Sequence, residues 1–299
     1  MEAVGVADYA FRFWADAGGV YSGRFVTLQG APRWIAIGSH TFQPVEIFKL
    51  CLIVYLASFF ASREGKRMNS FSETLVPFGL IMAAIVVICY AQRSLGSLAL
   101  LIGIGGIMYF MAGLDFKYVI CLAVVLAGVV FLFIKFEPFR AERWQAFKNP
   151  QADPLGSGYH TLQILTTIGS GGFRGVGLGH SRQKISFLPE SMSDSIFAIW
   201  AEETGFIGTS SLLIAFSLLF WRGMNIARHS RELCSKLLAG GIIAWLTLQS
   251  FFNIAANTNL IPLSGVPLPF FSYGGSALIA VMVGCGILLN ISRYTVNRR

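Results

Sequence analysis

The chain has 299 residues, of which 55% are hydrophobic and 13% are charged, and its mean hydropathy is +0.63. Soluble domains carry about 25% charged residues, so this composition excludes a soluble protein and indicates a polytopic membrane protein. The net charge of +8 is scattered among apolar segments. It therefore disfavours nucleic acid as a partner and agrees with the excess of Lys and Arg at the cytoplasmic ends of membrane helices.

Residues 1–44 contain no apolar run long enough to span a membrane and no signal-peptide pattern. Seven later stretches have the length of about 20 residues that a transmembrane helix needs. We place them at 45–61, 74–91, 95–112, 117–134, 196–221, 237–257 and 270–291. The sequence thus predicts an all-α transmembrane bundle in four parts, which are an N-terminal segment (1–44), four helices (45–134), a long loop (135–194) and three helices (195–299).

Two charged residues lie in the first turn of the first span. Glu46 and Lys49 are three residues apart, so they share a helix face and can pair. An ion pair just inside a membrane helix usually faces a cavity or the bundle interior. The alternative is a pair that holds two helices together.

The basic residues of the short loops and of the C-terminus predict the orientation. One set of alternate loops holds eleven of them, and the short loops of the other set hold Arg93 alone. The positive-inside rule then places the first set and the C-terminus in the cytoplasm, and the 135–194 loop outside with the 257–270 loop beside it. The eleven are Arg63, Lys66, Arg67, Lys117, Arg222, Arg228, Arg231, Lys236, Arg293, Arg298 and Arg299.

The extracytoplasmic 135–194 loop is itself basic, and it is too long to carry weight for the orientation. Its Lys and Arg residues can pair with acidic residues and lipid headgroups, or they can hold an anionic substrate, because both side chains bind phosphates. Eight glycines between Gly156 and Gly179 allow close backbone approach to a ligand or to another helix. This part could be a re-entrant element over a cavity, since irregular backbone at membrane depth needs shielding.

Carboxylates gather at the start of the fifth span. Glu190 and Asp194 lie just before it, and Glu202 and Glu203 lie in its first two turns. Charge at the edge of the hydrocarbon layer is costly, so these residues need a local partner or a function. Asp194 could cap the helix, because Asp is a favoured N-cap residue.

The loop before the last span contains three prolines, which stop the preceding helix and favour extended turns. The small residues of the sequence SYGG then open the span and permit tight helix packing. Ser272, the first of them, is alternatively a substrate contact.

Four blocks of sequence carry a resemblance to a known family. They are GAPRWIAIGSHTFQPVEIFK (30–49), DPLGSGYHTLQ with IGSGGFRGVGLGHSRQK (153–184), FLPESMSDSIFAIWAEETGFIG (187–208) and LIPLSGVPLPFFSYGGSAL (260–278). In this order and spacing they resemble the SEDS family, the shape, elongation, division and sporulation proteins that include FtsW, RodA and SpoVE. The joint match is specific, although no single block is.

The resemblance implies a peptidoglycan glycosyltransferase that polymerises lipid II at the outer face of the bacterial cytoplasmic (inner) membrane, for cell division or cell-shape maintenance. It also implies a class B penicillin-binding protein as partner, further divisome or elongasome proteins, and membrane lipid around the spans. Asp194 matches the family's essential aspartate, a few residues after LPE. Arg33 and Trp34 match its Arg-Trp pair, and Glu46 and Lys49 match the Glu and Lys of its QPxE helix.

In this reaction the 4-hydroxyl of lipid II attacks the anomeric carbon of the growing glycan and displaces a pyrophosphate. A carboxylate can take the hydroxyl proton, so Asp194 is the predicted base, or alternatively the ligand of a divalent cation, Mg²⁺ or Mn²⁺. No other cofactor is expected, because the five cysteines and four histidines form no CxxC or HExxH pattern. The predicted substrate contacts are Arg33, Trp34, Glu46, Lys49, Arg174, Lys184, Glu190 and Ser272.

Two other functions stay open, a lipid II flippase and a scaffold that only recruits the transpeptidase. The charged groups gather at the outer face rather than at the midplane, where transporters bind substrate, which favours the enzyme. Departures from the family pattern at Arg93, Ser94, Met192 and Ser193 keep the scaffold open. Division is slightly preferred over elongation. Because the family usually has ten spans, we expect an incomplete reading of a longer gene or a membrane-inserted N-terminus.

Overall fold

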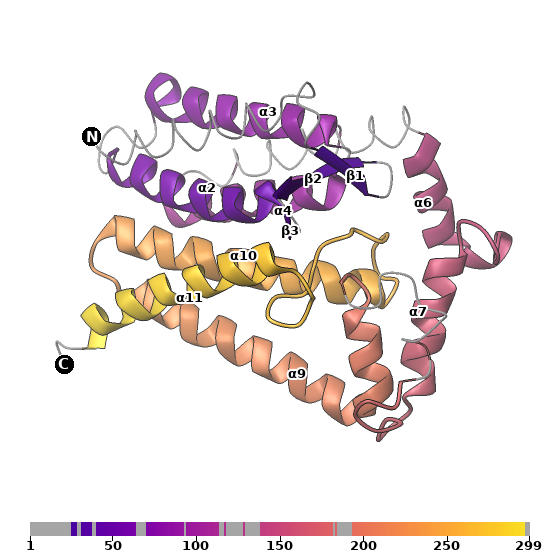
Figure 1. Ribbon diagram of the computed structural model, residues 1–299. Coiled ribbons are helices and arrows are strands. Elements are labelled where there is room, and N and C mark those ends of the chain that lie inside the picture. The colour runs from indigo at the N-terminus through magenta and orange to yellow at the C-terminus, as the bar shows by residue number, and fades with distance from the viewer. Residues whose placement is uncertain are drawn as a thin grey trace. The chain divides into compact units, whose positions relative to one another are not determined.

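Helices dominate the part of the chain that the computed structural model describes, which is residues 25–28, 31–37, 40–63, 70–92, 94–113, 117, 128, 138–181, 183 and 193–296 (Figure 1). The chain divides into two compact units. The first consists of Met1–Leu122, Trp221–Leu248 and Gly275–Arg299, and the second of Ala123–Phe220 and Gln249–Gly274.

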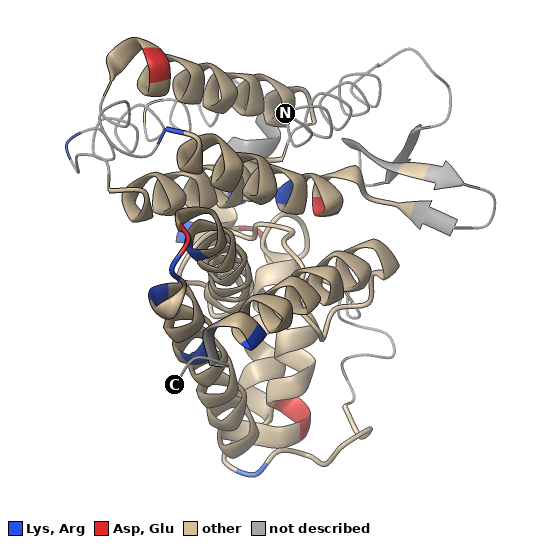
Figure 2. Cartoon of the chain, turned by 90° about the vertical axis from the view of Figure 1, so that its left-hand side faces the viewer, with Lys and Arg blue, Asp and Glu red and all other residues tan. Residues whose placement is uncertain are grey.

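Five of the described helices are long and apolar enough to cross a membrane. They are α2 (Pro44–Ala61), the π-helical turn η1 (Phe71–Leu75) continued by α3 (Val76–Ala91), α9 (Ile196–His229), α10 (Leu233–Asn257) and α11 (Gly275–Val296). A shorter apolar helix, α4, covers Leu95–Met111. Charged residues are few along these helices (Figure 2), because charged side chains are costly in the apolar interior of a membrane.

Six of the seven predicted spans coincide with described helices, because the thickness of a bilayer sets the length of the apolar run. The 117–134 segment lies outside the described residues except for Lys117 and Gly128. The last helix begins at Gly275 rather than at residue 270, since the chain turns at Phe270, whose φ is 68°. α9 extends beyond the predicted residue 221, to His229. The predicted helical bundle is confirmed, and the four-part division of the chain stays a prediction.

A small antiparallel sheet precedes α2, and the sequence prediction did not include it. Its strands are β1 (Phe25–Leu28), β2 (Ala31–Ile37) and β3 (His40–Phe42), in the order β1-β2-β3. Val26 pairs with Trp34, and Ile35 pairs with Phe42. The β-branched and aromatic residues of these runs favour strands, but each run is too short to be recognised beside spans of about 20 apolar residues.

The helices of the first unit pack through an aromatic core. α4 lies against both α2 and α3, and α2 also lies against α11. The ring centroids of Phe60, Phe78 and Tyr109, one from each of α2, α3 and α4, are 5.0 to 6.1 Å apart, which is the spacing of favourable aromatic pairs. α10 approaches closely at Gly241, where a Cβ atom would meet the side chains of Ile53 and Met108.

The second unit is built around the start of α9. It contains α6 (Pro138–Lys148), the 3-10 turn η2 (Pro150–Ala152), α7 (Tyr159–Ser170), the first part of α9 and the end of α10. Ile164 of α7 is buried against Ala198 of α9, and Leu268 of the loop after α10 is buried against Phe197. The first turn of α9 is thus enclosed by α7 and by this loop.

Candidate active site

Asp194 lies in the turn Ser193–Ser195, here named the Asp194 turn, which leads directly into α9. The carbonyl oxygen of Ser195 accepts the first bonds of the helix, from the amides of Ala198 at 3.0 Å and Ile199 at 3.4 Å. Because the N-cap residue is the one whose carbonyl accepts these bonds, Ser195 occupies the N-cap position that the sequence had suggested for Asp194. Asp194 is half-buried and stands one residue ahead of the helix.

Two amides of α10 bind the backbone of Asp194. The Nδ2 atoms of Asn253 and Asn257 donate to its carbonyl oxygen at distances of 3.0 and 2.9 Å. The side chains of Asn253 and Asn257 are only 1% and 2% exposed. A carbonyl oxygen has two lone pairs, so both bonds can form together and fix the position of this peptide group.

The two neighbours of Asp194 are also bound from other elements. Ser272 donates its hydroxyl to the carbonyl oxygen of Ser193 at 2.6 Å and accepts the amide of Leu268 at 2.7 Å. On the other side, His160 Nε2 of α7 lies 3.0 Å from the hydroxyl oxygen of the buried Ser195 in a hydrogen bond. Three separate parts of the fold therefore hold three consecutive residues.

α10 also organises the loop that carries Ser272. Gln249 Nε2 donates to the carbonyl oxygen of Pro267 at 2.9 Å, and Asn253 Nδ2 donates to that of Val266 at 2.8 Å. Residues 262–268 form neither helix nor strand, so their buried carbonyls need side-chain donors. The buried amides of α10 supply those donors and place the loop beside the Asp194 turn.

A glycine-rich segment, residues 171–181, replaces missing helical bonds in α9. The helix is interrupted at Gly205, whose φ of 65° and ψ of −162° are not helical, so carbonyls before it and amides after it need other partners. The segment supplies them through four backbone bonds. These are Val176 N to Glu202 O (3.0 Å), Gly177 N to Glu203 O (3.0 Å), Phe206 N to Gly172 O (3.0 Å) and Ile207 N to Phe173 O (3.3 Å).

Only glycine fits where these two backbones meet. A Cβ atom at Gly175 would collide with the carbonyl of Glu203, and a Cβ atom at Gly205 would collide with the backbone of Arg174 and Gly175. The sequence predicted a close backbone approach to a ligand or to another helix. The structure places this part of the segment against a helix, and the re-entrant position in a membrane stays a prediction.

Two carboxylates of α9 bind the far end of the same segment. Glu202, which is 2% exposed, accepts a hydrogen bond from the hydroxyl of Ser181. Glu203 accepts the amide of Ser181 at 3.4 Å. The sequence assigned these two carboxylates no role, although their place just before Gly205 was a signal that they serve the break in the helix.

Glu46 and Lys49 form the predicted ion pair in the first turn of α2. The Oε2 and Nζ atoms are 2.7 Å apart, and the side chains are 2% and 3% exposed. Lys49 Nζ also lies 5.3 Å from the centroid of the Trp245 ring of α10, a cation–π distance. The Gln43 amide just before α2 donates to the hydroxyl of Ser276 in α11 at 3.2 Å. The first turn of α2 is thus bound to α10 and α11.

The remaining predicted site residues are described in part. Arg33 and Trp34 lie on β2, and their side chains are outside the described part of the structure. Lys184 and Glu190 are outside the described residues altogether. Arg174 is exposed at the end of a turn in the glycine-rich segment. The structure therefore joins Ser272 to the Asp194 turn, and Glu46 to Lys49.

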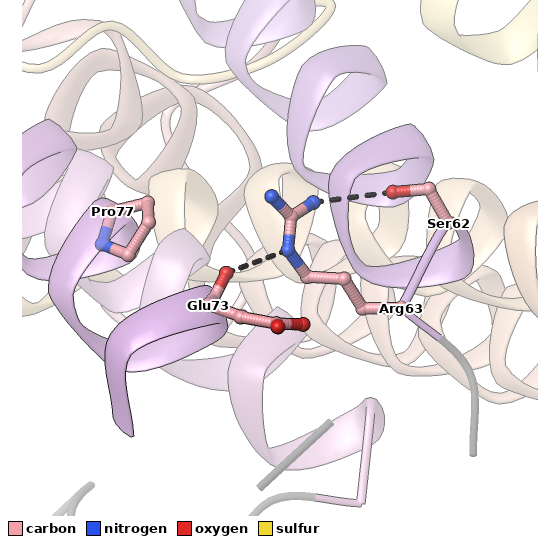
Figure 3. A pocket seen from close by; sticks show the side chains of 4 residues that line it. All are labelled: Ser62, Arg63, Glu73 and Pro77. Carbon is pink, nitrogen blue, oxygen red and sulfur yellow. Dashed lines mark hydrogen bonds between the residues drawn. The ribbon is translucent and has the colours of Figure 1, made fainter. Parts of the chain in front are cut away.

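A separate opening of about 380 Å³ lies in the first unit and is lined by Ser62, Arg63, Glu73 and Pro77 (Figure 3). Arg63 binds the Glu73 carbonyl oxygen at 2.7 Å through Nε and the Phe59 carbonyl oxygen at 3.0 Å. Its guanidinium also lies 3.8 Å from the centroid of the Phe59 ring. Arg63 thus connects the end of α2 to η1, and these contacts indicate a structural role.

The described ranges contain no group of three or more His, Cys, Asp and Glu side chains that could hold a metal ion. Glu190, a neighbouring carboxylate in the sequence, is outside those ranges. A divalent cation bound by Asp194 therefore stays a prediction.

The long apolar helices, with their buried polar groups near the helix ends, define a multi-pass membrane protein. The FtsW/RodA/SpoVE family, described as "Cell cycle protein", matches residues 24–297 of the chain. The chain belongs to this family.

Curated relatives and solved structures agree with this membership. The chain is 41% identical to "Stage V sporulation protein E" of Bacillus subtilis strain 168 over 268 residues, 89% of this chain and 72% of that protein. It is 36% identical to "Probable peptidoglycan glycosyltransferase FtsW" of Geobacter sp. strain M18 over 267 residues, 89% of this chain and 72% of that protein.

Two solved structures share the fold over 98% of this chain. One, described as "Structural coordination of polymerization and crosslinking by a peptidoglycan synthase complex", has a TM-score of 0.79 at 26% identity over 81% of its chain. The other, the rod shape determining protein RodA of Thermus thermophilus, has a TM-score of 0.69 at 26% identity over 78% of its chain.

Proposed function

We propose that the chain is a peptidoglycan glycosyltransferase that polymerises lipid II into glycan strands. The main structural support is that the Asp194 turn is held by hydrogen bonds from α7, from α10 and from the loop before α11. These bonds fix the backbone that carries the Asp194 carboxylate, and a catalytic group requires such positioning. The names of the relatives support the same chemistry.

In the proposed reaction, the Asp194 carboxylate takes the proton of the 4-hydroxyl of the acceptor lipid II. The hydroxyl oxygen forms a bond to the anomeric carbon of the growing glycan. The bond from that carbon to the pyrophosphate oxygen breaks, and its electron pair leaves with the pyrophosphate.

The leaving pyrophosphate needs positive charge nearby. Among the described candidates, the exposed Arg174 suits this role better than Lys49, which is buried against Glu46 and Trp245. Lys184 and Arg33 complete the set of basic candidates from the sequence. If a divalent cation is bound, Asp194 would hold it, and it would supply further positive charge.

The proposed place of action is the outer face of the bacterial cytoplasmic membrane, with the C-terminus in the cytoplasm. The proposed partner is a class B penicillin-binding protein, since the solved complex of a relative couples polymerization with crosslinking. Cell division is preferred over elongation, in line with the relatives named FtsW.

The test is polymerisation of lipid II by the purified chain with its transpeptidase partner. We expect Asp194→Asn to reduce glycan synthesis by about 100-fold or more, as for the loss of a general base. The matched control is Asp153→Asn in the same loop. Asp153 accepts the amides of Gly156 and Ser157 at 3.1 and 2.9 Å in a local turn, and we expect this variant to keep full activity.

Lipid II translocation is the second candidate, favoured by the buried Glu46–Lys49 pair in a membrane span. Vesicles that contain the purified chain would then move lipid II across the bilayer without making glycan. Full polymerisation by the Asp194→Asn variant would refute the catalytic role of Asp194.

A further inference from the structure

The amide pair, Asn253 and Asn257, is unusual because both side chains bind the same backbone atom. They are four residues apart and hence on one face of α10, and both donate to the carbonyl oxygen of Asp194. Burial of a primary amide in an apolar helix is costly unless its groups are bonded. Two such residues at one carbonyl are more than the backbone of a turn needs, since one donor would satisfy it.

The bonds also fix which way each amide points. Asn253 Nδ2 faces the carbonyl oxygens of Asp194 and Val266, and Asn257 Nδ2 faces those of Asp194 and Asn253. Only the nitrogen end of an amide can donate to a carbonyl, so the opposite orientation would place oxygen against oxygen. Each amide is therefore locked as a donor toward the Asp194 turn.

The flanking bonds complete the arrangement. Ser272 binds the carbonyl of Ser193 and His160 binds the hydroxyl of Ser195, so the chain is fixed immediately before and after Asp194. A backbone that is fixed on both sides fixes the direction of the Cα–Cβ bond, and the backbone conformation determines which side-chain rotamers are allowed. The bonds to the backbone of this turn thus restrict where the Asp194 carboxylate can lie.

We propose that Asn253 and Asn257 are positioning residues for Asp194, and that they raise the rate of glycan synthesis by holding the backbone of the Asp194 turn. This inference rests on the proposed function. A displacement of about 1 Å in a reacting group can cost about 100-fold in rate. Loss of the amide donors should thus lower kcat, while the affinity for lipid II, set by other residues, should change little.

The test compares Asn253→Leu and Asn257→Leu with the parent chain in its complex with the transpeptidase. Leu has the same branched side-chain skeleton as Asn but donates no hydrogen bond. We expect kcat for lipid II to fall by about 10- to 100-fold in each variant, with KM within about threefold. Asn257→Gln keeps an amide donor and should recover part of the lost kcat.

The matched control is Thr258→Val, at the position directly after α10. In the described contacts, the Thr258 hydroxyl bonds only to the carbonyl oxygens of Ile254 and Ala255 in the last turn of α10, so this variant should keep both kcat and KM. Ser272→Ala is the second probe, because it removes the bond to Ser193 and leaves Asn253 and Asn257 unchanged. A fall in kcat alone supports positioning, whereas a rise in KM alone would assign Ser272 to substrate binding and count against the proposal.

The outcomes separate this inference from the proposed function. If Asp194→Asn is inactive while both Leu variants and Ser272→Ala keep the parent kcat, positioning by these residues is refuted and the catalytic role of Asp194 stands. If Asp194→Asn is active, the proposed function itself fails. If the Leu variants do not fold, the kcat of Ser272→Ala decides alone.

Discussion

At the scale of single residues, the Glu46–Lys49 pair has two candidate roles. Both side chains are almost fully buried, and Lys49 also contacts Trp245 on another helix. A buried ion pair is often no more stabilising than an apolar pair, but the loss of one partner leaves a buried charge unpaired. Stability and catalysis can therefore be separated by changing one residue or both.

We expect Lys49→Met to destabilise the protein by about 3 kcal/mol, because Glu46 would stay buried without its cation. The double variant, Glu46→Gln with Lys49→Met, should recover most of that loss. Thermal unfolding of the purified chain measures both effects. If the double variant regains stability but not polymerisation, Lys49 or Glu46 acts on the substrate; if it regains both, the pair is structural. Parent-like stability of Lys49→Met would contradict the expectation.

At the scale of elements, Gly205 divides α9 into two helical segments, and the glycine-rich segment binds the backbone on both sides of this break. The break at Gly205 frees backbone groups, and residues 172–177 bind them. Glu202 and Glu203 hold the other end of the segment through Ser181. The place of the exposed Arg174 is thus set by the backbone of α9, so that a helix of the bundle positions a basic side chain of the loop.

Gly205→Ala should disrupt the backbone contact between the glycine-rich segment and α9. Its φ of 65° and ψ of −162° belong to a region that only glycine occupies readily, and a methyl group would collide with the backbone of Arg174 and Gly175. We expect a loss of at least about 2 kcal/mol and faster proteolytic cleavage within residues 171–181.

The control for this variant is Gly169→Ala in α7. Nothing lies within 4 Å of a Cβ atom there, and Ala is favoured over Gly in a helix by up to about 1 kcal/mol. Parent-like or slightly higher stability is therefore expected. Equal thermal unfolding temperatures for Gly205→Ala and Gly169→Ala would contradict the stabilising role of the contact at Gly205.

At the scale of the whole molecule, the sequence predicted the spans well because a bilayer imposes length and apolarity directly. Asp194 stood out because charge at a membrane edge is costly, and its predicted catalytic role came from the resemblance to the SEDS family. Asn253 and Asn257 were missed, since an amide in an apolar run can bond within its own helix, and their partner lies 59 and 63 residues away in the sequence. The sheet before α2 and the late start of α11 depend on local backbone geometry that hydropathy does not report.

The orientation predicted from Lys and Arg can be tested on the full chain. Cys234 follows the basic turn between α9 and α10, on the predicted cytoplasmic side, and Ser157 is exposed before α7 on the predicted outer side. The other cysteines, Cys51, Cys89, Cys121 and Cys285, are first replaced by Ser. The first variant keeps Cys234 as its one cysteine, and the second has Cys234 replaced and carries Ser157→Cys. A maleimide that cannot cross membranes should label the second variant in intact spheroplasts. It should label the first variant only after lysis. The reverse pattern would place Ser157 on the cytoplasmic side, together with the Asp194 turn that His160 of α7 binds, where lipid-linked glycan synthesis at the outer face could not use Asp194.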